Sequence, residues 1–137
     1  MKKILIVIIV TLSIFNVSAQ EKSQKIIFDV TSTDNKVYQS VMLTIKIMTS
    51  SHPDTKFDII AYGEAVPMFM KNQSVVADEI AKYVDNENVK FTACEVSMAL
   101  FNIKKDQLIT GVTTINNAVS EIVKKHGNGW AYIKSGN

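Results

Sequence analysis

Val89-Lys90-Phe91-Thr92-Ala93-Cys94 is the stretch that decides the fold of this chain. Its first five residues are β-branched, aromatic or small apart from one lysine, which predicts a buried strand over residues 89–93. After them, Val96, Leu100 and Ile103 recur at helical spacing, which predicts a helix over residues 94–103. A strand is therefore expected to run directly into a helix at the cysteine.

The same alternation of strand and helix recurs along the rest of the chain. Short β-branched runs end in polar or glycine-containing turns, and each is followed by a segment with apolar residues at helical spacing. This pattern predicts a single flavodoxin-like α/β domain, with a mostly parallel five-stranded sheet and helices on both faces. The expected strands are 25–31, 56–62, 89–93, 112–115 and 130–133, and the expected helices are 36–51, 74–86 with Ser74 as N-cap, 94–103, and one that Asn117 caps and 127–129 ends.

The first residues have the layout of a secretory signal peptide. Met1-Lys2-Lys3 is positively charged, residues 4–15 are almost entirely apolar, and Val17-Ser18-Ala19 ends in small residues. A retained membrane anchor is the alternative, but the apolar run is shorter than the roughly 20 residues that span a bilayer. We expect residues 1–19 to be removed and residues 20–137 to form the domain. The protein is then exported, periplasmic or secreted, with no stable membrane anchor after cleavage.

The charge pattern argues against nucleic acid as a partner. The chain has 15 basic and 13 acidic residues, and removing Lys2 and Lys3 with the signal leaves 13 of each. Every basic residue is lysine, so the planar guanidinium that clamps phosphates and guanine edges is missing. The mature domain therefore lacks both the net positive charge and the side chain typical of a nucleic-acid surface.

Cys94 is the only cysteine in the sequence, so the chain cannot form an internal disulfide. An odd cysteine in an exported protein suggests intermolecular pairing or a free reactive thiol. The first turn of a helix favours thiolate over thiol, because its unpaired N–H groups and positive dipole end point at the sulfur. The alternative is an inert packing thiol, since free cysteine is among the most buried residue types.

Three segments are expected to meet at the carboxyl edge of the sheet, where ligands collect in open α/β folds. They are the loop that begins at Gly63-Glu64, the junction Cys94-Glu95, and the loop that begins at Asn116. The first of these, residues 63–70, is unusually apolar for a connection. It predicts either a partner surface or pocket wall, or a segment that folds back on its own domain as an irregular cap.

Other kinds of site find little support in the sequence. His52 follows the first predicted helix and His126 lies near the end of the last one, so neither is expected beside Cys94. One cysteine and two scattered histidines are a poor zinc ligand set, and no glycine-rich phosphate loop follows any predicted strand. We therefore expect no metal and no organic cofactor.

Several short segments spread along the predicted domain form a recognisable pattern. They are Ala61-Tyr62-Gly63-Glu64-Ala65-Val66, Phe91-Thr92-Ala93-Cys94, Ser97-Met98, residues 103–108, Val112, Ala118-Val119, Glu121-Ile122-Val123 and Gly129-Trp130-Ala131-Tyr132-Ile133-Lys134. Through them the chain resembles the DsrE/DsrF-like family over nearly the whole predicted domain. The resemblance implies a small α/β fold, assembly as trimers or hexamers, and persulfide chemistry on a cysteine at the position of Cys94. Many relatives carry a histidine where this chain has Tyr62.

These observations predict an exported sulfur carrier rather than a hydrolase or an oxidoreductase. Cys94 is the candidate catalytic residue, and its partner is a sulfur donor or acceptor protein or a small thiol. One alternative is a non-catalytic oligomeric binding module with a structural cysteine, and a weaker one is a redox-sensing thiol. The candidate binding residues around Cys94 are Tyr62, Gly63, Glu64, Glu95 and Asn116.

Overall fold

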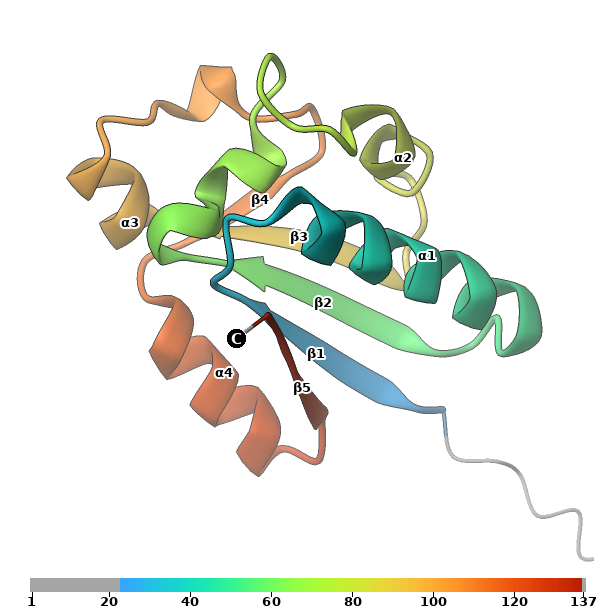
Figure 1. Ribbon diagram of the computed structural model, residues 1–137. Helices are drawn as coiled ribbons and strands as arrows, with labels where there is room; N and C mark the ends of the chain where they lie inside the picture. Colours follow the sequence, from blue (N-terminus) through green and yellow to red (C-terminus); the bar gives the residue numbers. More distant parts are fainter. Residues whose placement is uncertain (1–22, 137) are drawn as a thin grey trace, which may run out of the picture.

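The structure is a computed structural model that describes residues 23–136, so the predicted signal peptide lies outside the described residues. Strands and helices alternate along the chain (Figure 1). Within the described residues, no helix is both long enough and apolar enough to cross a membrane. The elements are β1 (Lys25–Val30), α1 (Asn35–Ser51), β2 (Lys56–Ala61), the 3₁₀ helix η1 (Gly63–Phe69), α2 (Ala77–Ala81), β3 (Val89–Cys94), α3 (Glu95–Leu100), the 3₁₀ helix η2 (Lys105–Gln107), β4 (Thr113–Ile115), α4 (Ala118–Gly127) and β5 (Ala131–Ser135).

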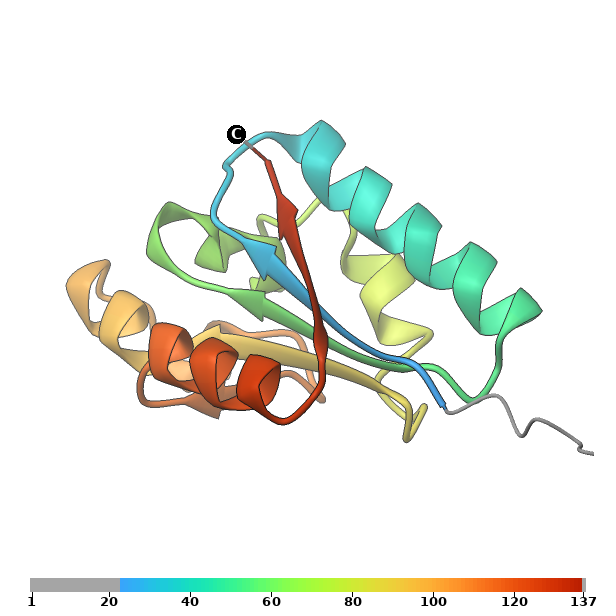
Figure 2. The same ribbon diagram turned by 90° about the horizontal axis from the view of Figure 1, so that it is seen from below.

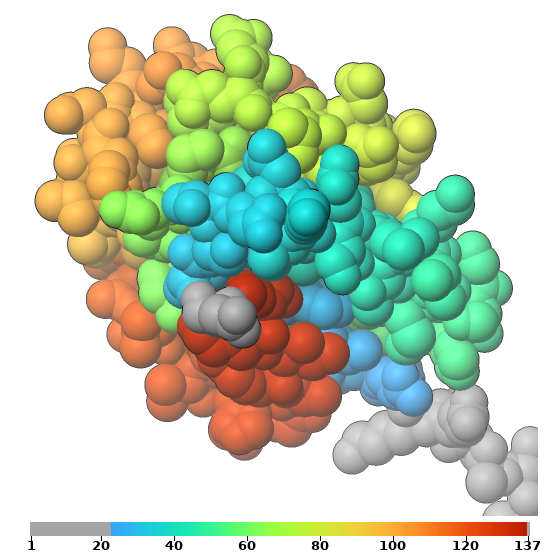
Figure 3. All heavy atoms as spheres, viewed as in Figure 1, coloured from blue at the N-terminus to red at the C-terminus, as the bar shows by residue number. Residues whose placement is uncertain are grey.

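The strands form one five-stranded sheet in the order β4-β3-β2-β1-β5, and every neighbouring pair is parallel. Helices α1 and α2 lie on one side of the sheet and α4 lies on the other (Figures 1 and 2). The predicted α/β class, strand number and helices on both faces are therefore confirmed. In the space-filling view α1 and the C-terminal segment lie next to each other, so that only a narrow part of β1 is visible between them (Figure 3).

The sheet face that carries α1, which we call the α1 face, holds the main apolar core. Alternate residues of a strand point to opposite faces, and on this face they are nearly all apolar. Phe28 stacks on Phe57 with ring centroids 6.3 Å apart, and Phe69 of η1 meets Phe91 edge-on at 5.9 Å. Ile45 of α1 is fully buried in the same core. Burial of this kind stabilises a fold by roughly 25 cal/mol for each Å² of apolar surface.

The opposite face, which we call the α4 face, has a small apolar cluster. The cluster consists of Ile27, Ile60, Cys94, Ala118 and Ile122, with Tyr62 and Trp130 packed against it. Buried polar side chains occupy other positions of the strand interiors, and an ion pair ties α4 to them. Lys125 Nζ lies 2.7 Å from Asp58 Oδ2 and 4.1 Å from the centroid of the Trp130 ring. Thr92 donates a hydrogen bond to the same Asp58 carboxylate at 2.7 Å.

Two predicted helices are shorter than their apolar spacing suggests. The helix predicted over residues 74–86 is helical only as α2, and the predicted N-cap Ser74 is wrong because Val76 holds that position. The Ser74 hydroxyl instead accepts a hydrogen bond from the Val76 N–H at 3.2 Å, which makes a local turn. The helix predicted over residues 94–103 begins at Glu95 and ends before Asn102, whose φ of 54° is incompatible with a helix.

The apolar segment 63–70 does not form an exposed partner surface. It folds as η1 against the α1 face, where Val66, Met68 and Phe69 are buried. This is the irregular cap of the second interpretation, and the prediction of an exposed partner surface is wrong. Glu64, Pro67 and Met70 of the segment also line a groove. The apolar residues of this segment have no regular helical or strand spacing, so their sequence predicts a connection. A short 3₁₀ helix nevertheless directs them toward the core.

Candidate functional site

Cys94 lies at the point where two helices begin. It is the last residue of β3 and the N-cap residue of α3, and its backbone is extended. It pairs in register with Ile115, the last residue of β4, so the chain that leaves β4 enters α4 beside it. Asn117 caps α4 as predicted, because its side chain accepts a hydrogen bond from the Ser120 N–H at 3.0 Å. The starts of α3 and α4 therefore converge on one thiol.

The convergence surrounds the sulfur with hydrogen-bond donors. The Ser97 and Ala118 N–H groups, at the starts of α3 and α4, stabilise the thiolate form of this sulfur and lower its pKa, and the Val96 N–H, which donates to the Asn116 carbonyl oxygen at 3.2 Å, contributes less. The Ser97 hydroxyl makes a further hydrogen bond to the sulfur. On the other side, Sγ lies 3.7 Å from the carbonyl oxygen of Asn116, a contact in which the thiol donates.

These donors decide the ionisation of the buried thiol. Burial raises the pKa of Cys94, but the hydrogen bonds from Ser97, Ala118 and Val96 together outweigh burial and hold the pKa below its ordinary value. Donors favour the charged form of an acid because they satisfy the anion's lone pairs. A thiolate is the nucleophilic form of cysteine, so the local backbone creates a nucleophile.

Ser97 is a site residue that sequence reasoning missed. Its hydroxyl accepts a hydrogen bond from the Gly63 N–H at 2.8 Å and donates to Cys94, so one oxygen links the loop after β2 to the thiol. The sequence signal was the spacing, since residues three apart at a helix start can meet. Gly63 has a φ of 60°, which favours glycine, and a Cβ at this position would meet no atom within 4 Å. The space beside Gly63 is therefore open.

A second group of polar side chains lies beside Tyr62, which follows β2 and packs against the cluster that contains Cys94. The Tyr62 hydroxyl donates to Asp29 Oδ2 at 3.4 Å, and the Tyr132 hydroxyl of β5 donates to the same oxygen. Lys134 Nζ lies 3.8 Å from that oxygen. Asp29 was missed in the sequence, where its signal was a single carboxylate between the apolar residues of a predicted buried strand.

The two tyrosines remain protonated near neutral pH. Burial raises the pKa of Tyr62, and the charge of Asp29, the hydrogen bond to Asp29 and the nearby Cys94 raise it further. The hydrogen bond to Asp29 raises the pKa of Tyr132 to about 12, with burial and the charge of Asp29 acting in the same direction. Both hydroxyls therefore act as hydrogen-bond donors toward Asp29.

The structure separates the other candidate binding residues. Glu95 turns away from the thiol, because its carboxylate accepts from Thr114 Oγ1 at 2.6 Å and pairs with Lys105 Nζ at 2.7 Å. The hydrogen bond from Lys105 is the main reason that the pKa of Glu95 lies below its ordinary value. Glu64 is exposed and lines a separate groove near Phe101. Asn116 meets the thiol through its backbone carbonyl rather than through its side chain.

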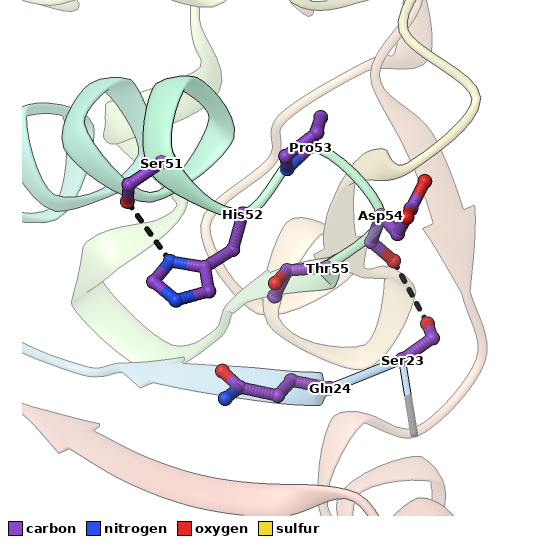
Figure 4. Close-up of a pocket in the computed structure, with 7 residues that line it drawn as sticks. All are labelled: Ser23, Gln24, Ser51, His52, Pro53, Asp54 and Thr55. Atoms are coloured by element: carbon purple, nitrogen blue, oxygen red, sulfur yellow. Dashed lines mark hydrogen bonds between the residues drawn. The ribbon is translucent and has the colours of Figure 1, made fainter. Parts of the chain in front are cut away.

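The histidines lie away from Cys94. His52 lines a hollow at the opposite, amino edge of the sheet, where its Nδ1 lies 2.9 Å from the Ser51 hydroxyl oxygen (Figure 4). His126 of α4 meets the ring of Tyr132, with centroids 6.4 Å apart. Within residues 23–136, no three histidine, cysteine, aspartate or glutamate side chains come close enough to hold a metal ion.

Comparisons with known proteins give a family from a sequence model and a fold from two solved structures. A model of the DsrE/DsrF/DrsH-like family matches residues 15–126. The structure is similar to that of a protein of unknown function, MTH1491, from Methanobacterium thermoautotrophicum, with a TM-score of 0.75 and 20% sequence identity over 82% of this chain and 99% of that chain. It is also similar to the ychN protein from E. coli, with a TM-score of 0.65 and 16% identity over 81% of this chain and 98% of that chain. Comparison with curated proteins gave no significant match.

Proposed function

Because this chain belongs to the DsrE/DsrF/DrsH-like family, we propose that it is a sulfur carrier that binds sulfane sulfur as a persulfide on Cys94. Family membership supports a function of sulfur-relay type. The single observation that carries the proposal is the set of donors from two helix starts that lowers the pKa of the Cys94 thiol. A packing cysteine needs no such donors, whereas a nucleophile does.

The chemistry is an exchange between sulfur atoms. The Cys94 thiolate attacks the sulfane sulfur of a donor, a new S–S bond forms on Sγ, and the bond between the sulfane sulfur and the donor breaks. The electron pair of that bond leaves with the donor as its thiolate. No net oxidation takes place, so the transfer needs neither a metal nor an organic cofactor.

The test is to treat the purified protein with inorganic polysulfide and to measure its mass. We expect an adduct of about 32 Da on Cys94 that a reducing thiol removes, because a persulfide is reversible whereas a sulfinic acid of the same nominal mass is not. Cys94→Ser is the matched control and should remain unmodified. An unmodified native thiol would contradict the carrier function and would favour the alternative, a binding module with a structural cysteine.

We also propose that the chain assembles as a homo-oligomer, a trimer or a hexamer. Support comes from exposed apolar side chains on α3 and α4, among them Leu100 of α3, 73% exposed, and Val123 of α4, 66% exposed. Exposed apolar surface of this kind is typical of interaction sites. Sedimentation should give a mass of several protomers, and Leu100→Lys or Val123→Lys should reduce it. A monomeric native protein would contradict the assembly.

Export remains part of the proposal. The charged start, the apolar run and the small residues at 17–19 support removal of residues 1–19. Mass spectrometry of the protein recovered from the exported fraction of its host should show Gln20 as the first residue. Recovery with Met1 still attached would contradict cleavage.

A further inference from the structure

We propose that Tyr62 and Asp29 form a proton relay that takes the proton of the acceptor thiol when sulfur leaves Cys94. This inference rests on the proposed sulfur-carrier function and assigns a role to Asp29, which the uptake of sulfur does not use. In the relay, Tyr62 passes the proton on and Asp29 is the final proton acceptor.

One oxygen of the Asp29 carboxylate accepts no hydrogen bond from the described residues. It is only 3% exposed and lies within β1 on the α4 face. Its Oδ2 accepts from the Tyr62 and Tyr132 hydroxyls, whereas no donor among the described residues forms a hydrogen bond with the buried Oδ1. A buried polar atom without a partner is costly and therefore rare. We infer that this carboxylate serves a step in which it receives a proton.

Tyr62 connects the carboxylate to the sulfur. Its ring packs against the cluster that contains Cys94, and its hydroxyl reaches Asp29 at 3.4 Å. That distance is longer than the 2.5–3.0 Å range of O–H···O hydrogen bonds, so the hydroxyl is weakly held and free to reorient. A sulfur atom bound to Cys94 extends about 2 Å beyond Sγ, which brings the reacting centre out from the thiol toward its neighbours.

The charges around the site explain why a relay is needed. Asp29 faces Tyr62 from β1, Tyr132 and Lys134 face Asp29 from β5, and His126 of α4 meets the ring of Tyr132 and the Trp130 carbonyl oxygen. Lys134 is the one cation near Asp29 among the described residues, and it is 46% exposed at 3.8 Å. An acceptor thiolate would enter beside a buried carboxylate, which is unfavourable at low dielectric. The acceptor therefore enters as a neutral thiol and loses its proton inside.

The step balances in atoms and electrons. The acceptor sulfur attacks the outer sulfur of the protonated Cys94 persulfide, a new S–S bond forms, and the bond from the outer sulfur to Sγ breaks. The outer sulfur keeps its hydrogen in the new persulfide on the acceptor. Its electron pair returns to Cys94, which leaves as the thiolate that the two helix starts stabilise. The proton of the acceptor passes to the Tyr62 oxygen while the Tyr62 proton passes to Asp29 Oδ2. Asp29 then releases the proton to solvent, and no oxidant or reductant takes part.

The test compares loading with discharge. The native protein, Asp29→Asn and Tyr62→Phe are loaded with inorganic polysulfide, the persulfide is confirmed by mass, and its loss to 2-mercaptoethanol is timed. We expect both variants to load to the same extent as the native protein. At about pH 6.5 their rate of discharge should be lower than the native rate by a factor of about ten or more, which is a modest contribution for acid–base catalysis. At about pH 9.5 the difference should fall below about twofold, because the acceptor thiol ionises without help.

Matched controls separate the relay from damage to the fold. Asp85→Asn removes an exposed carboxylate and Tyr83→Phe removes a partly buried hydroxyl, both on the segment between α2 and β3, and both should load and discharge like the native protein. Discharge that is unchanged at low pH, or equally slow at every pH, would overturn the relay and leave the carrier function intact. A variant that loads poorly would also overturn it. A native protein that does not load would overturn the proposed function itself.

Discussion

The two faces of the sheet are built from the same strands but differ in what they bury. The α1 face is packed almost entirely with apolar side chains, including the aromatic pairs Phe28–Phe57 and Phe69–Phe91. The α4 face has a small apolar cluster and buries Asp58 and Thr92 among others. Apolar burial stabilises a fold, whereas buried polar groups stabilise it only when they are paired. We therefore expect the α1 face to contribute most of the stability, and the α4 face to hold the groups around the Cys94 thiol.

The α4 face therefore depends on polar contacts to hold its helix. Ala118 and Ile122 are the buried apolar residues of α4, and the helix is further fixed by Lys125, which pairs with Asp58 and lies over Trp130. The position of α4 matters because its first N–H group reaches the Cys94 sulfur. The ion pair fixes the orientation of α4 on the sheet, because Lys125 and Asp58 must lie within contact distance of each other.

The largest expected effect is on the α1 face. Phe69→Ala removes a fully buried ring that packs on Phe91, and it should lower the free energy of unfolding by about 3–5 kcal/mol. Urea unfolding measures the change, and Leu43→Ala, at a residue of α1 that is 57% exposed, is the control and should change stability by less than about 0.5 kcal/mol. Equal stability of the two variants would break the assignment of stability to this face.

The next effect is on the ion pair of the α4 face. Lys125→Met leaves the buried Asp58 carboxylate without its cation, and it should cost about 3 kcal/mol, at the lower end for a broken buried pair because Lys125 is partly exposed. The double variant Asp58→Asn with Lys125→Met removes both charges and should regain most of the loss in urea unfolding. A double variant no more stable than Lys125→Met would show that the pair does not hold α4.

The smallest expected effect on stability comes from a variant that alters the chemistry of the thiol. Ser97→Ala removes the hydroxyl that donates to the thiol, so the pKa of Cys94 should rise toward its ordinary value. The rate of alkylation by iodoacetamide follows the thiolate, so its rise with pH should shift to higher pH. Ser120→Ala, on exposed α4 surface, should leave the profile in place. An unshifted profile in Ser97→Ala would remove Ser97 from the site.

The fold was predictable because each strand has a recognisable local sequence pattern. Runs such as 25–31 and 89–93 combine β-branched and aromatic residues, and their alternation with helical spacing indicates a parallel sheet. The helix predicted over 74–86 failed for a physical reason: Tyr83 and Val84 pack against the core from turns after α2 rather than from a continuous helix. Spacing reports which residues point inward and does not report the backbone hydrogen bonds between them.

The candidate site was predictable only in part. Topology alone brings Cys94 and Asn116 to one edge of the sheet, because parallel strands end together. The partners of Asp29 were not predictable, because Tyr132 lies 103 residues away in sequence and meets it only when β5 adds beside β1. Glu95, a sequence neighbour of the thiol, turns instead to Lys105. Proximity in sequence is therefore a poor guide to side-chain direction at a helix start.

The central claim is that the α4 face holds a thiolate at Cys94. The most direct test is the ultraviolet absorbance of the thiolate in the native protein as a function of pH, with Cys94→Ser subtracted as the blank. The account predicts a pKa below the value of about 8.5 for an unperturbed cysteine, because the donors from α3 and α4 outweigh burial. A pKa at or above that value would show that burial dominates and would contradict the account.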